Sequence, residues 1–421
     1  MVERQVAMGE RVRTGSDPLL KRGAGDTAPC ILFGAHDRHN FGDLLFGRVA
    51  QALLEDRAVE PAGLVSRDMS PYGGFRITSI DELARRWRDA PVEIIHIGGE
   101  ILSTTAWQAA VMLAEPAEAQ ALIGRYDADP AAGCAYASGL FGFSAQAPYL
   151  VGRELFPQAR RIVCNAVGGA DLAAMEEAFR DEVLRKLAGV DVLFVREHST
   201  QAALRAAGIE AGLAPDPAVL TVQLFGGEIA AEMVRGEVAR CRQAFPQGFL
   251  AVQFSAACGD DATLTRIARQ LDEIAALHEH GIVLLRAGAA PWHDDLDVYR
   301  RCAALMRRPV RLFASLELWQ IVALIAASEG FLGTSLHGRI VACAYAKPRV
   351  SFLPSSLQGR ANKLVAYTAT WEMPQMPGVV SIDRLAEAFE QALRVPRGMQ
   401  KAHAETLAAR YREAAGKIFM R

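Results

Sequence analysis

The stretch "GFLGTSLHGRIVACAYAKPRVSFL", residues 330–353, reads as a strand, a turn, a helix and a second strand. Thr334 or Ser335 is a suitable helix N-cap, and Lys347 with Pro348 ends the helix. A buried stripe at helical spacing is formed by Leu336, Ile340, Val341, Ala344 and Tyr345. A helix between two apolar strands is the crossover that joins parallel neighbours, so this stretch predicts an α/β fold.

Similar strand-like runs recur along the chain, each followed by a polar or small-residue loop and a helical pattern. The first series comprises residues 30–35, 93–99, 133–139, 160–169 and 190–197. The second series comprises residues 249–256, 281–288, 308–314, 329–335 and 347–353. This alternation predicts parallel sheets with helices on both faces. We therefore expect two Rossmann-like, doubly wound domains that face a cleft.

The domain boundaries follow from length and from breaks in the pattern. A chain of 421 residues exceeds the usual size of one core, and segment 214–248 carries Pro and Gly between the two series. We expect a mobile tail at 1–28, an N-terminal domain at 29–228, a C-terminal domain at 229–395 and a C-terminal helix at 396–421.

Composition restricts the classes of function. Hydrophobic residues make up 51%, charged residues 22%, and the net charge is -2, which is typical of a soluble globular protein and argues against nucleic-acid binding through a basic surface. We find no apolar run long enough for a transmembrane segment and no signal-peptide core at the N-terminus. The seven cysteines are scattered without a CxxC pair, which predicts reduced thiols and a cytoplasmic location.

Candidate site residues follow from the rule that ligands bind beyond the carboxyl ends of parallel strands. His337 and Arg339 occupy the first helical turn after Ser335, off the buried stripe and beside unpaired backbone N–H groups. Such N–H groups and two cationic side chains predict a phosphate or carboxylate site. The alternative is a solvated polar helix face.

Other strand ends add further candidates. In "NFGD" (40–43), Asn40 and Asp43 resemble a capping box, although they also lie in a loop that suits a binding site. Arg196 ends an apolar strand and points to solvent or to a ligand, and His293 follows the strand at 281–288. The HxxH spacing of residues 36 and 39 lacks further ligands, so we predict no metal.

The order of these motifs resembles the polysaccharide pyruvyl transferase family over residues 30–365. The matching pieces are "NFGD" (40–43), "IGGE" (97–100), "VREHSTQAALRAAGI" (195–209), "PDPAVL" (215–220), "GTSLHGRIVACAYAKPRVSF" (333–352) and "NKL" (362–364). The family transfers the enolpyruvyl unit of phosphoenolpyruvate to sugar hydroxyls as a ketal. The resemblance implies a glycosyltransferase-B-like architecture and a part in exopolysaccharide or cell-envelope synthesis.

The resemblance also implies roles for individual residues. His337 would contact the donor phosphate and supply a proton, and Asp43 would accept the proton of the acceptor hydroxyl in the N-terminal domain. The substrate-binding residues would be Asn40, Arg196, Ser335, Arg339, His293, Arg360 and Lys363. The family usually has Arg where this chain has Ser335, so Arg339, Arg360 or Lys363 would have to replace that guanidinium.

The expected partners are phosphoenolpyruvate, as co-substrate with no further cofactor, and a sugar or lipid-linked glycan acceptor. Contact with a membrane is expected only through such a lipid-linked acceptor, and the pattern predicts no particular oligomeric state. Two alternatives share the fold: a glycosyltransferase that uses a nucleotide sugar, and a non-catalytic homologue that binds sugar phosphates.

Overall fold

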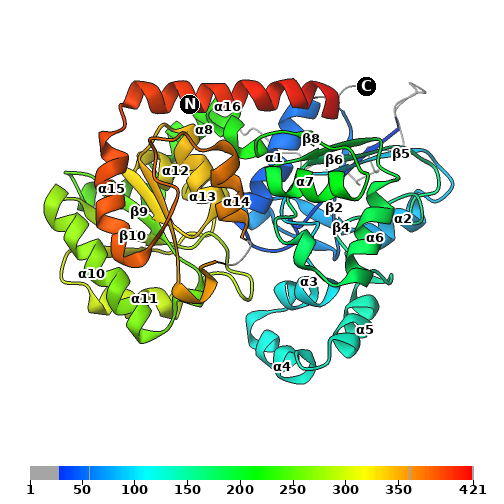
Figure 1. Cartoon of the computed structure of the whole chain (residues 1–421), viewed down its shortest axis with the longest axis horizontal. Helices are drawn as coiled ribbons and strands as arrows, with labels where there is room; N and C mark the ends of the chain where they lie inside the picture. The colour runs from blue at the N-terminus through cyan, green and yellow to red at the C-terminus, as the bar shows by residue number, and fades with distance from the viewer. Residues whose placement is uncertain (1–27, 56, 360–361, 420–421) are drawn as a thin grey trace, which may run out of the picture.

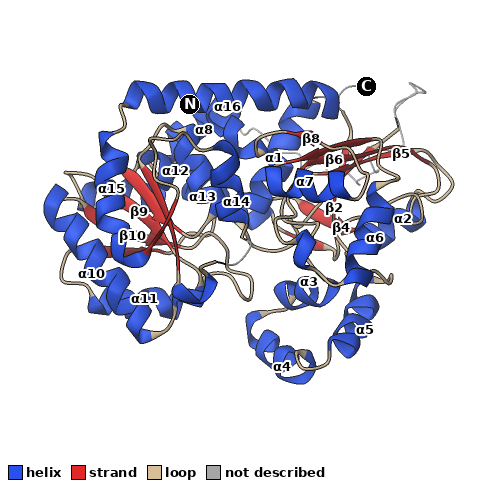
Figure 2. Ribbon diagram, viewed as in Figure 1, coloured by secondary structure: helices blue, strands red, loops and turns tan. Residues whose placement is uncertain are grey.

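The structure is a computed structural model, and it describes residues 28–55, 57–359 and 362–419. The predicted N-terminal tail, apart from Ala28, and the candidate Arg360 lie outside the described residues. Two α/β domains lie side by side, each built around a sheet that helices cover (Figures 1 and 2). This arrangement confirms the predicted fold class.

The N-terminal domain contains an eight-stranded sheet in the order β3-β4-β2-β1-β5-β6-β7-β8. All neighbours are parallel except β3 and β4. Its strands are β1 (Cys30–Phe33), β2 (Val59–Gly63), β3 (Arg67–Asp68), β4 (Arg76–Ser79), β5 (Val92–His96), β6 (Ala159–Val167), β7 (Val192–Val195) and β8 (Gly212–Leu213). Its helices are α1 (Phe41–Leu54), α2 (Ile80–Arg86), α3 (Ala106–Leu113), α4 (Pro116–Tyr126), α5 (Pro130–Phe141), α6 (Glu177–Leu187) and α7 (His198–Ala206).

The C-terminal domain contains a six-stranded parallel sheet in the order β11-β10-β9-β12-β13-β14. Its strands are β9 (Phe249–Gln253), β10 (Gly281–Leu285), β11 (Val310–Phe313), β12 (Gly330–Gly333), β13 (Arg349–Leu353) and β14 (Val379–Ser381). Its helices are α8 (Thr221–Glu232), α9 (Gly236–Ala244), α10 (Asp261–His278), α11 (Leu296–Leu305), α12 (Leu318–Ala327), α13 (Leu336–Ala344), α14 (Lys363–Trp371) and α15 (Leu385–Arg394). In both sheets the strand order reverses beside the first strand, which marks the expected ligand position.

The structure differs from the sequence prediction at residues 133–139 and refines the predicted domain boundary. Residues 133–139 are not a strand but part of α5, because Asp129 caps the helix through Ala132 N and Pro130 occupies its first turn. The boundary expected at residue 228 falls inside α8, which packs against α12 of the C-terminal domain.

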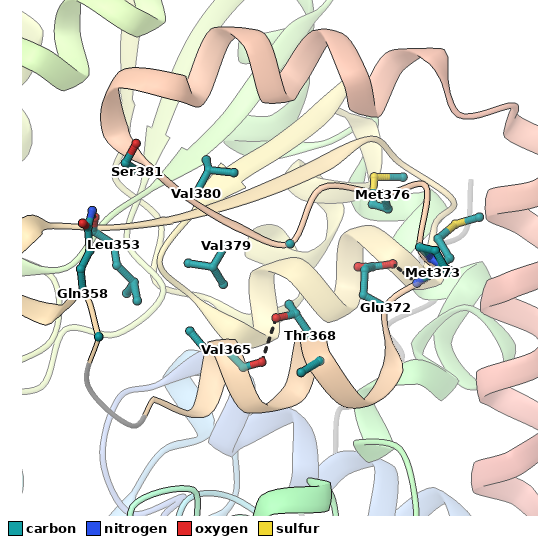
Figure 3. A pocket seen from close by; sticks show the side chains of 14 residues that line it. Leu353, Gln358, Val365, Thr368, Glu372, Met373, Met376, Val379, Val380 and Ser381 are labelled. Atoms are coloured by element: carbon teal, nitrogen blue, oxygen red, sulfur yellow. Dashed lines mark hydrogen bonds between the residues drawn. The ribbon is translucent and has the colours of Figure 1, made fainter.

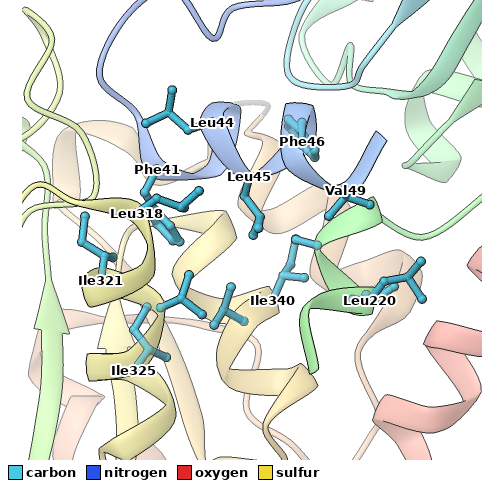
Figure 4. Packing of buried hydrophobic residues seen from close by; sticks show 14 of the residues in the cluster. Phe41, Leu44, Leu45, Phe46, Val49, Leu220, Leu318, Ile321, Ile325 and Ile340 are labelled. Atoms are coloured by element: carbon cyan, nitrogen blue, oxygen red, sulfur yellow. The ribbon is translucent and has the colours of Figure 1, made fainter. Parts of the chain in front are cut away.

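Helix α1 joins the two domains through an apolar core (Figure 4). Its Phe41, Leu45 and Val49 are fully buried, and they face Leu318 of α12 and Ile340 of α13. Burial of side chains of this size contributes roughly 1.5–3 kcal/mol each. This apolar contact between α1 and helices α12 and α13 fixes the position of the N-terminus of α1 relative to the N-terminus of α13.

The last helix, α16 (Arg397–Ile418), makes a second connection, because it runs from α15 back across the N-terminal domain (Figure 1). Near its end, the Tyr411 hydroxyl donates to Asn165 Oδ1 at 2.9 Å. Arg161 Nη1 donates to the Ile418 carbonyl at 2.8 Å. A C-terminal helix was predicted here. Within the described residues, no helix combines the length and the apolar character that crossing a membrane requires.

Candidate functional site

A cavity of about 410 Å³ lies between the domains. Its walls include the loops that follow β1, β5 and β7 in the N-terminal domain and β9, β10, β12 and β13 in the C-terminal domain, so it occupies the carboxyl ends of both sheets. Seven of the predicted site residues line it: Asn40, Asp43, Arg196, His293, Ser335, His337 and Lys363. The sequence therefore located this cavity from loops that lie up to about 300 residues apart.

The side chain of His337, from the C-terminal domain, contacts helix α1 of the N-terminal domain at this cavity. Ser335 caps α13 by accepting a hydrogen bond from Gly338 N at 3.1 Å, which places His337 in the first turn. The imidazole then lies edge to face with Phe46, with ring centroids 4.8 Å apart. A Cβ on Gly42 would lie only 1.8 Å from His337 Nδ1. Gly42 of the "NFGD" motif thus provides the space that His337 occupies.

Asp216 faces the other nitrogen of the imidazole. His337 Nε2 lies 3.6 Å from Asp216 Oδ2, and this buried nitrogen has no hydrogen bond to another described residue. The Asp216 carboxylate also accepts from Ala218 N at 3.0 Å and from Arg196 Nη1 at 3.2 Å. Burial opposes ionisation of Asp216, but His337 and Arg196 outweigh it and hold the pKa of this carboxyl below its usual range. Asp216 therefore lies where it can orient the ring, whose Nδ1 lies against Gly42.

The "NFGD" loop contributes an ion pair to the opposite wall. Asn40 caps α1 by accepting from Gly42 N at 3.0 Å, as predicted. Asp43 does not bond back to Asn40, because its carboxylate lies 3.4 Å from Arg38 Nη2. Arg38 also donates to the Tyr149 hydroxyl at 2.8 Å, and its Nε has no partner in the described part of the chain. Arg38 is thus a cavity cation that the sequence analysis did not select.

Arg196 lines the cavity, but its charge is already balanced. Its guanidinium contacts Glu197 at 2.6 Å, Glu100 at 2.6 Å and Asp216 at 3.2 Å. Three carboxylates around one fully buried guanidinium leave no net positive charge for a phosphate. The prediction that Arg196 supplies donor-binding charge is therefore corrected: Arg196 holds the carboxylates of the cavity floor in place.

Arg339 points away from the cavity, which contradicts its predicted contact with the donor. Its Nε and Nη2 donate to Glu372 at 3.0 and 2.7 Å. Its other bonds reach Ser351 Oγ at 3.1 Å, Gly378 O at 3.2 Å and Pro377 O at 2.6 Å. These five hydrogen bonds use every N–H of the guanidinium. All residues of α13 from Leu336 to Cys343 are buried, which excludes the alternative of a solvated polar helix face. Arg339 packs instead against the segment that follows α14.

Replacement of Arg339 by Lys tests this structural role. The ammonium cannot reproduce the forked contact with Glu372 and the two carbonyl bonds together, so we expect the free energy of unfolding to fall by about 2 kcal/mol. Affinity for the substrate is expected to stay within twofold, because Arg339 does not line the cavity. Urea unfolding and substrate titration of the same preparation measure both. A variant of normal stability that loses substrate affinity would contradict the assignment.

The loop after β10 places His293 and Asp294 against the cavity. Burial, with Arg38 nearby, lowers the pKa of His293 to about 4, so this imidazole is neutral at physiological pH. Burial raises the pKa of Asp294 to about 7. Asp294 accepts from Ala287 N at 2.6 Å and from Gln253 Nε2 at 2.8 Å. The next acid along the loop, Asp295, caps α11 by accepting from Asp297 N at 2.8 Å.

The raised pKa of Asp294 predicts a pH-dependent loss of stability. An unfolded Asp titrates near pH 4, whereas the folded protein keeps this proton up to about pH 7, so stability falls as pH rises through that window. Between pH 5 and 7, we expect Asp294 to account for a loss of about 2 kcal/mol. Asp294→Asn should remove this part of the slope, which urea unfolding at pH 5, 6 and 7 measures. Equal slopes in the two proteins would contradict the prediction.

Two helix N-termini open toward the cavity. Ser335 begins α13, and Asn362 begins α14 by accepting from Leu364 N at 2.8 Å. Lys363 follows directly and also lines the cavity. First-turn backbone N–H groups and an adjacent ammonium create a positive end wall. The described part of the chain contains no cluster of three or more His, Cys, Asp or Glu suited to a metal ion.

A second groove, of about 570 Å³, lies between α14 and β14 (Figure 3). Its walls include Val365, Val379 and Met376, together with Glu372, whose carboxylate is held by Arg339 and by a second buried arginine. None of the described residues that line it is Lys, Arg or His. The groove is therefore unsuited to an anionic donor, and the cavity between the domains is the candidate active site.

Solved structures share this fold at low sequence identity. A UDP-GlcNAc 2-epimerase from Neisseria meningitidis bound to UDP-GlcNAc is 12% identical, with a TM-score of 0.54 and coverage of 94% of this chain and 100% of that chain. A UDP-GlcNAc 2-epimerase from Methanocaldococcus jannaschii is 11% identical, with a TM-score of 0.51 and coverage of 91% and 99%. Such likeness shows the fold alone, which is the predicted two-domain, glycosyltransferase-B-like architecture.

The sequence itself identifies the family. No curated protein matches the chain. The family model described as polysaccharide pyruvyl transferase matches residues 40–356, from the N-cap of α1 to the loop after β13. This range covers well over half of the chain and contains both His337 and the "NFGD" motif that makes room for it. The chain belongs to the polysaccharide pyruvyl transferase family.

Proposed function

We propose that this protein is a transferase that moves the enolpyruvyl unit of phosphoenolpyruvate to two hydroxyls of a sugar, as a ketal. One observation carries the proposal: His337 of the C-terminal domain lies against Gly42 of the N-terminal domain and lines the cavity between the two domains together with Asp43. Family membership supports the reaction class. The expected acceptor is a sugar or a lipid-linked glycan, and the expected setting is exopolysaccharide or cell-envelope synthesis in the cytoplasm.

The positive end wall suits the donor. Phosphate would lie against the first turns of α13 and α14, where backbone N–H groups and Lys363 provide hydrogen bonds and charge. Arg38 adds positive charge from the opposite wall, where Asp43 and Tyr149 hold its guanidinium. Ser335 replaces the arginine usual in the family and caps α13 instead. Lys363 and Arg38 are therefore the groups that we propose for the missing guanidinium.

The reaction requires balanced proton transfers. Protonation of the vinyl methylene of phosphoenolpyruvate creates a methyl group and an electron-poor carbon, which one sugar hydroxyl attacks. The second hydroxyl then forms the second C–O bond as the C–O bond to phosphate breaks. One hydroxyl proton thus replaces the proton given to the methyl group, and the other leaves with inorganic phosphate. An acid, a base and an anion site suffice for these steps.

The cavity supplies these three functions from its own residues. We assign His337 to the phosphate contact and to delivery of the proton, with Asp216 orienting its ring at 3.6 Å. Asp43 lines the same cavity and is assigned as the base for the acceptor hydroxyl, with Arg38 at 3.4 Å keeping its carboxylate in place. Asp294, whose pKa burial raises to about 7, is able to hold a proton at neutral pH and restore it to the site.

Lys363→Gln separates binding from folding. The side chain lines the cavity, so we expect a KM for phosphoenolpyruvate about tenfold higher, in line with the loss of one charge-assisted hydrogen bond. Stability should change by no more than about 0.5 kcal/mol, as for most replacements of solvent-accessible residues. Arg339→Lys gives the opposite pattern and is the matched control. An unchanged KM would remove Lys363 from the donor site.

The direct test of the proposed function is product analysis. The protein is incubated with phosphoenolpyruvate and methyl glycosides of several hexoses, with phosphate release and the proton NMR signal of a ketal methyl group as readouts. We expect both signals to appear together with at least one glycoside. Release of UDP from UDP-GlcNAc without consumption of phosphoenolpyruvate would replace the proposal by a nucleotide-sugar transferase. Protection by phosphoenolpyruvate without turnover on any acceptor would indicate a binding homologue.

A further inference from the structure

Trp292 stands out among the residues of the cavity wall. It is 46% exposed, and the other exposed large apolar side chains of the described residues are Leu, Val or Met. Unlike Leu305, which is equally exposed, Trp292 lines the cavity between the domains. The indole has no role in the proposed proton transfers or in phosphate binding. Core packing does not explain a tryptophan at this position, because nearly half of its surface is exposed.

The backbone at Trp292 is built to present this side chain. Its φ is 64°, in the left-handed region that a bulky residue rarely adopts. The next two residues hold the turn: His293 N donates to Ala290 O at 3.1 Å, and Asp294 N donates to Gly288 O at 3.0 Å. Ala256 N also donates to the His293 carbonyl at 2.9 Å. A costly conformation that its surroundings fix in this way is characteristic of functional positions.

The N-terminal domain contributes polar side chains to the same cavity. Ser103 and Thr104 precede α3, Gln108 lies in the first turn of α3, and all three line the cavity together with Trp292. An indole provides a rigid, flat apolar face, whereas hydroxyl and amide groups bind hydroxyls. A pyranose ring matches both kinds of group, because its C–H groups form an apolar face that can stack on the indole and its hydroxyls lie around the edge, where polar side chains can bind them. A small trianion such as phosphoenolpyruvate has no comparable apolar face.

We propose that Trp292 is the stacking platform for the pyranose ring of the acceptor, with the polar groups of residues 103–108 on the opposite wall. The acceptor is then held by both domains, and its hydroxyls are turned toward Asp43 and the donor. This inference rests on the proposed function in that it takes the acceptor to be a sugar. Trp292 is a specificity-determining residue, since the indole favours acceptors that present an unbroken C–H face.

Kinetics of Trp292 variants test the platform. We expect Trp292→Ala to raise the KM for the acceptor at least tenfold, while the KM for phosphoenolpyruvate stays within twofold. Trp292→Phe, which keeps a flat ring, should recover most of the affinity. Leu305→Ala, an equally exposed site outside the cavity, should leave both constants unchanged. Equal KM values for the acceptor in Trp292→Ala and wild type would overturn the proposal.

A binding measurement keeps the test independent of pyruvyl transfer. Saturation-transfer NMR with methyl β-glucopyranoside and methyl β-galactopyranoside should show contact through ring C–H protons in the wild type and loss of that contact in Trp292→Ala. If no ketal forms yet this contact is seen and depends on Trp292, the sugar subsite stands and the pyruvyl donor is wrong. If ketal forms and the contact is the same without the indole, the platform is wrong.

Thermal stability distinguishes a binding role from a structural one. Glycine adopts positive φ freely, so Trp292→Gly should melt at or above the temperature of the wild type while losing acceptor affinity as Trp292→Ala does. A marked fall in the melting temperature of Trp292→Gly would show that the indole is needed for packing and would overturn its assignment as a ligand platform.

Discussion

His337→Ala is expected to lower kcat for ketal formation by about 10³-fold. The loss combines the positioned proton donor, which is typically worth 10²–10⁴-fold, with one contact to the leaving phosphate. Folding should be little affected, because Phe46 and Gly42 stay in place and a small void replaces the ring. Steady-state kinetics with saturating phosphoenolpyruvate measure the effect.

A matched histidine provides the control for this experiment. His198 is exposed at the start of α7 and does not line the cavity, so His198→Ala should keep kcat within twofold. A loss below about tenfold in His337→Ala would contradict the assigned acid role, because general acid catalysis is typically worth more. In that case Asp294, the other proton-carrying group of the cavity, would be the next residue to replace.

Gly42→Ala is expected to lower kcat about 10²-fold, although the change adds only one methyl group. The new Cβ would lie 1.8 Å from Nδ1 and 2.1 Å from Cγ of His337, so the ring must move away from its position beside Asp216. Displacement of a catalytic group by about 1 Å costs on the order of 10²-fold. Overpacking at the domain contact should also cost about 1–3 kcal/mol of stability.

A double-mutant cycle shows whether Gly42→Ala lowers kcat by displacing the His337 ring. In the His337→Ala background the obstructing ring is absent, so Gly42→Ala should have little further effect on kcat or stability. Gly139→Ala serves as the control, because Gly139 is exposed on α5 and a Cβ there meets nothing within 4 Å. Additive losses in the double variant would show that Gly42 acts independently of His337.

Most of the architecture was predictable because buried parallel strands are continuous apolar runs. The strands that the sequence did not reveal include the edge strands β3, β8 and β14, which have only two or three residues. They also include β2, an internal strand that contains Pro61. The run at 133–139 was wrongly assigned to a strand although Asp129 and Pro130 mark a helix start. Local capping signals outweigh an apolar run of small residues.

The candidate site was predictable in part, because the rule of strand ends places residues without knowledge of their partners. It selected His337, Asn40 and His293, which line the cavity, whereas Lys363 came from the family resemblance. Asp216 was overlooked because its link to His337 spans 121 residues and no local pattern reveals it. The prediction that Arg339 binds the donor was wrong for the same reason, because the hydrogen bond from its guanidinium to Glu372 joins residues that are distant in sequence.

Thermal stability of the wild type with phosphoenolpyruvate or UDP-GlcNAc tests the central claim most directly. A ligand present at 100 times its Kd adds about 2.7 kcal/mol, which corresponds to a rise in Tm of about 3 °C for a protein of this size. The account predicts a concentration-dependent rise with phosphoenolpyruvate that is reduced in Lys363→Gln, and no rise with UDP-GlcNAc. A rise with UDP-GlcNAc and none with phosphoenolpyruvate would contradict the account.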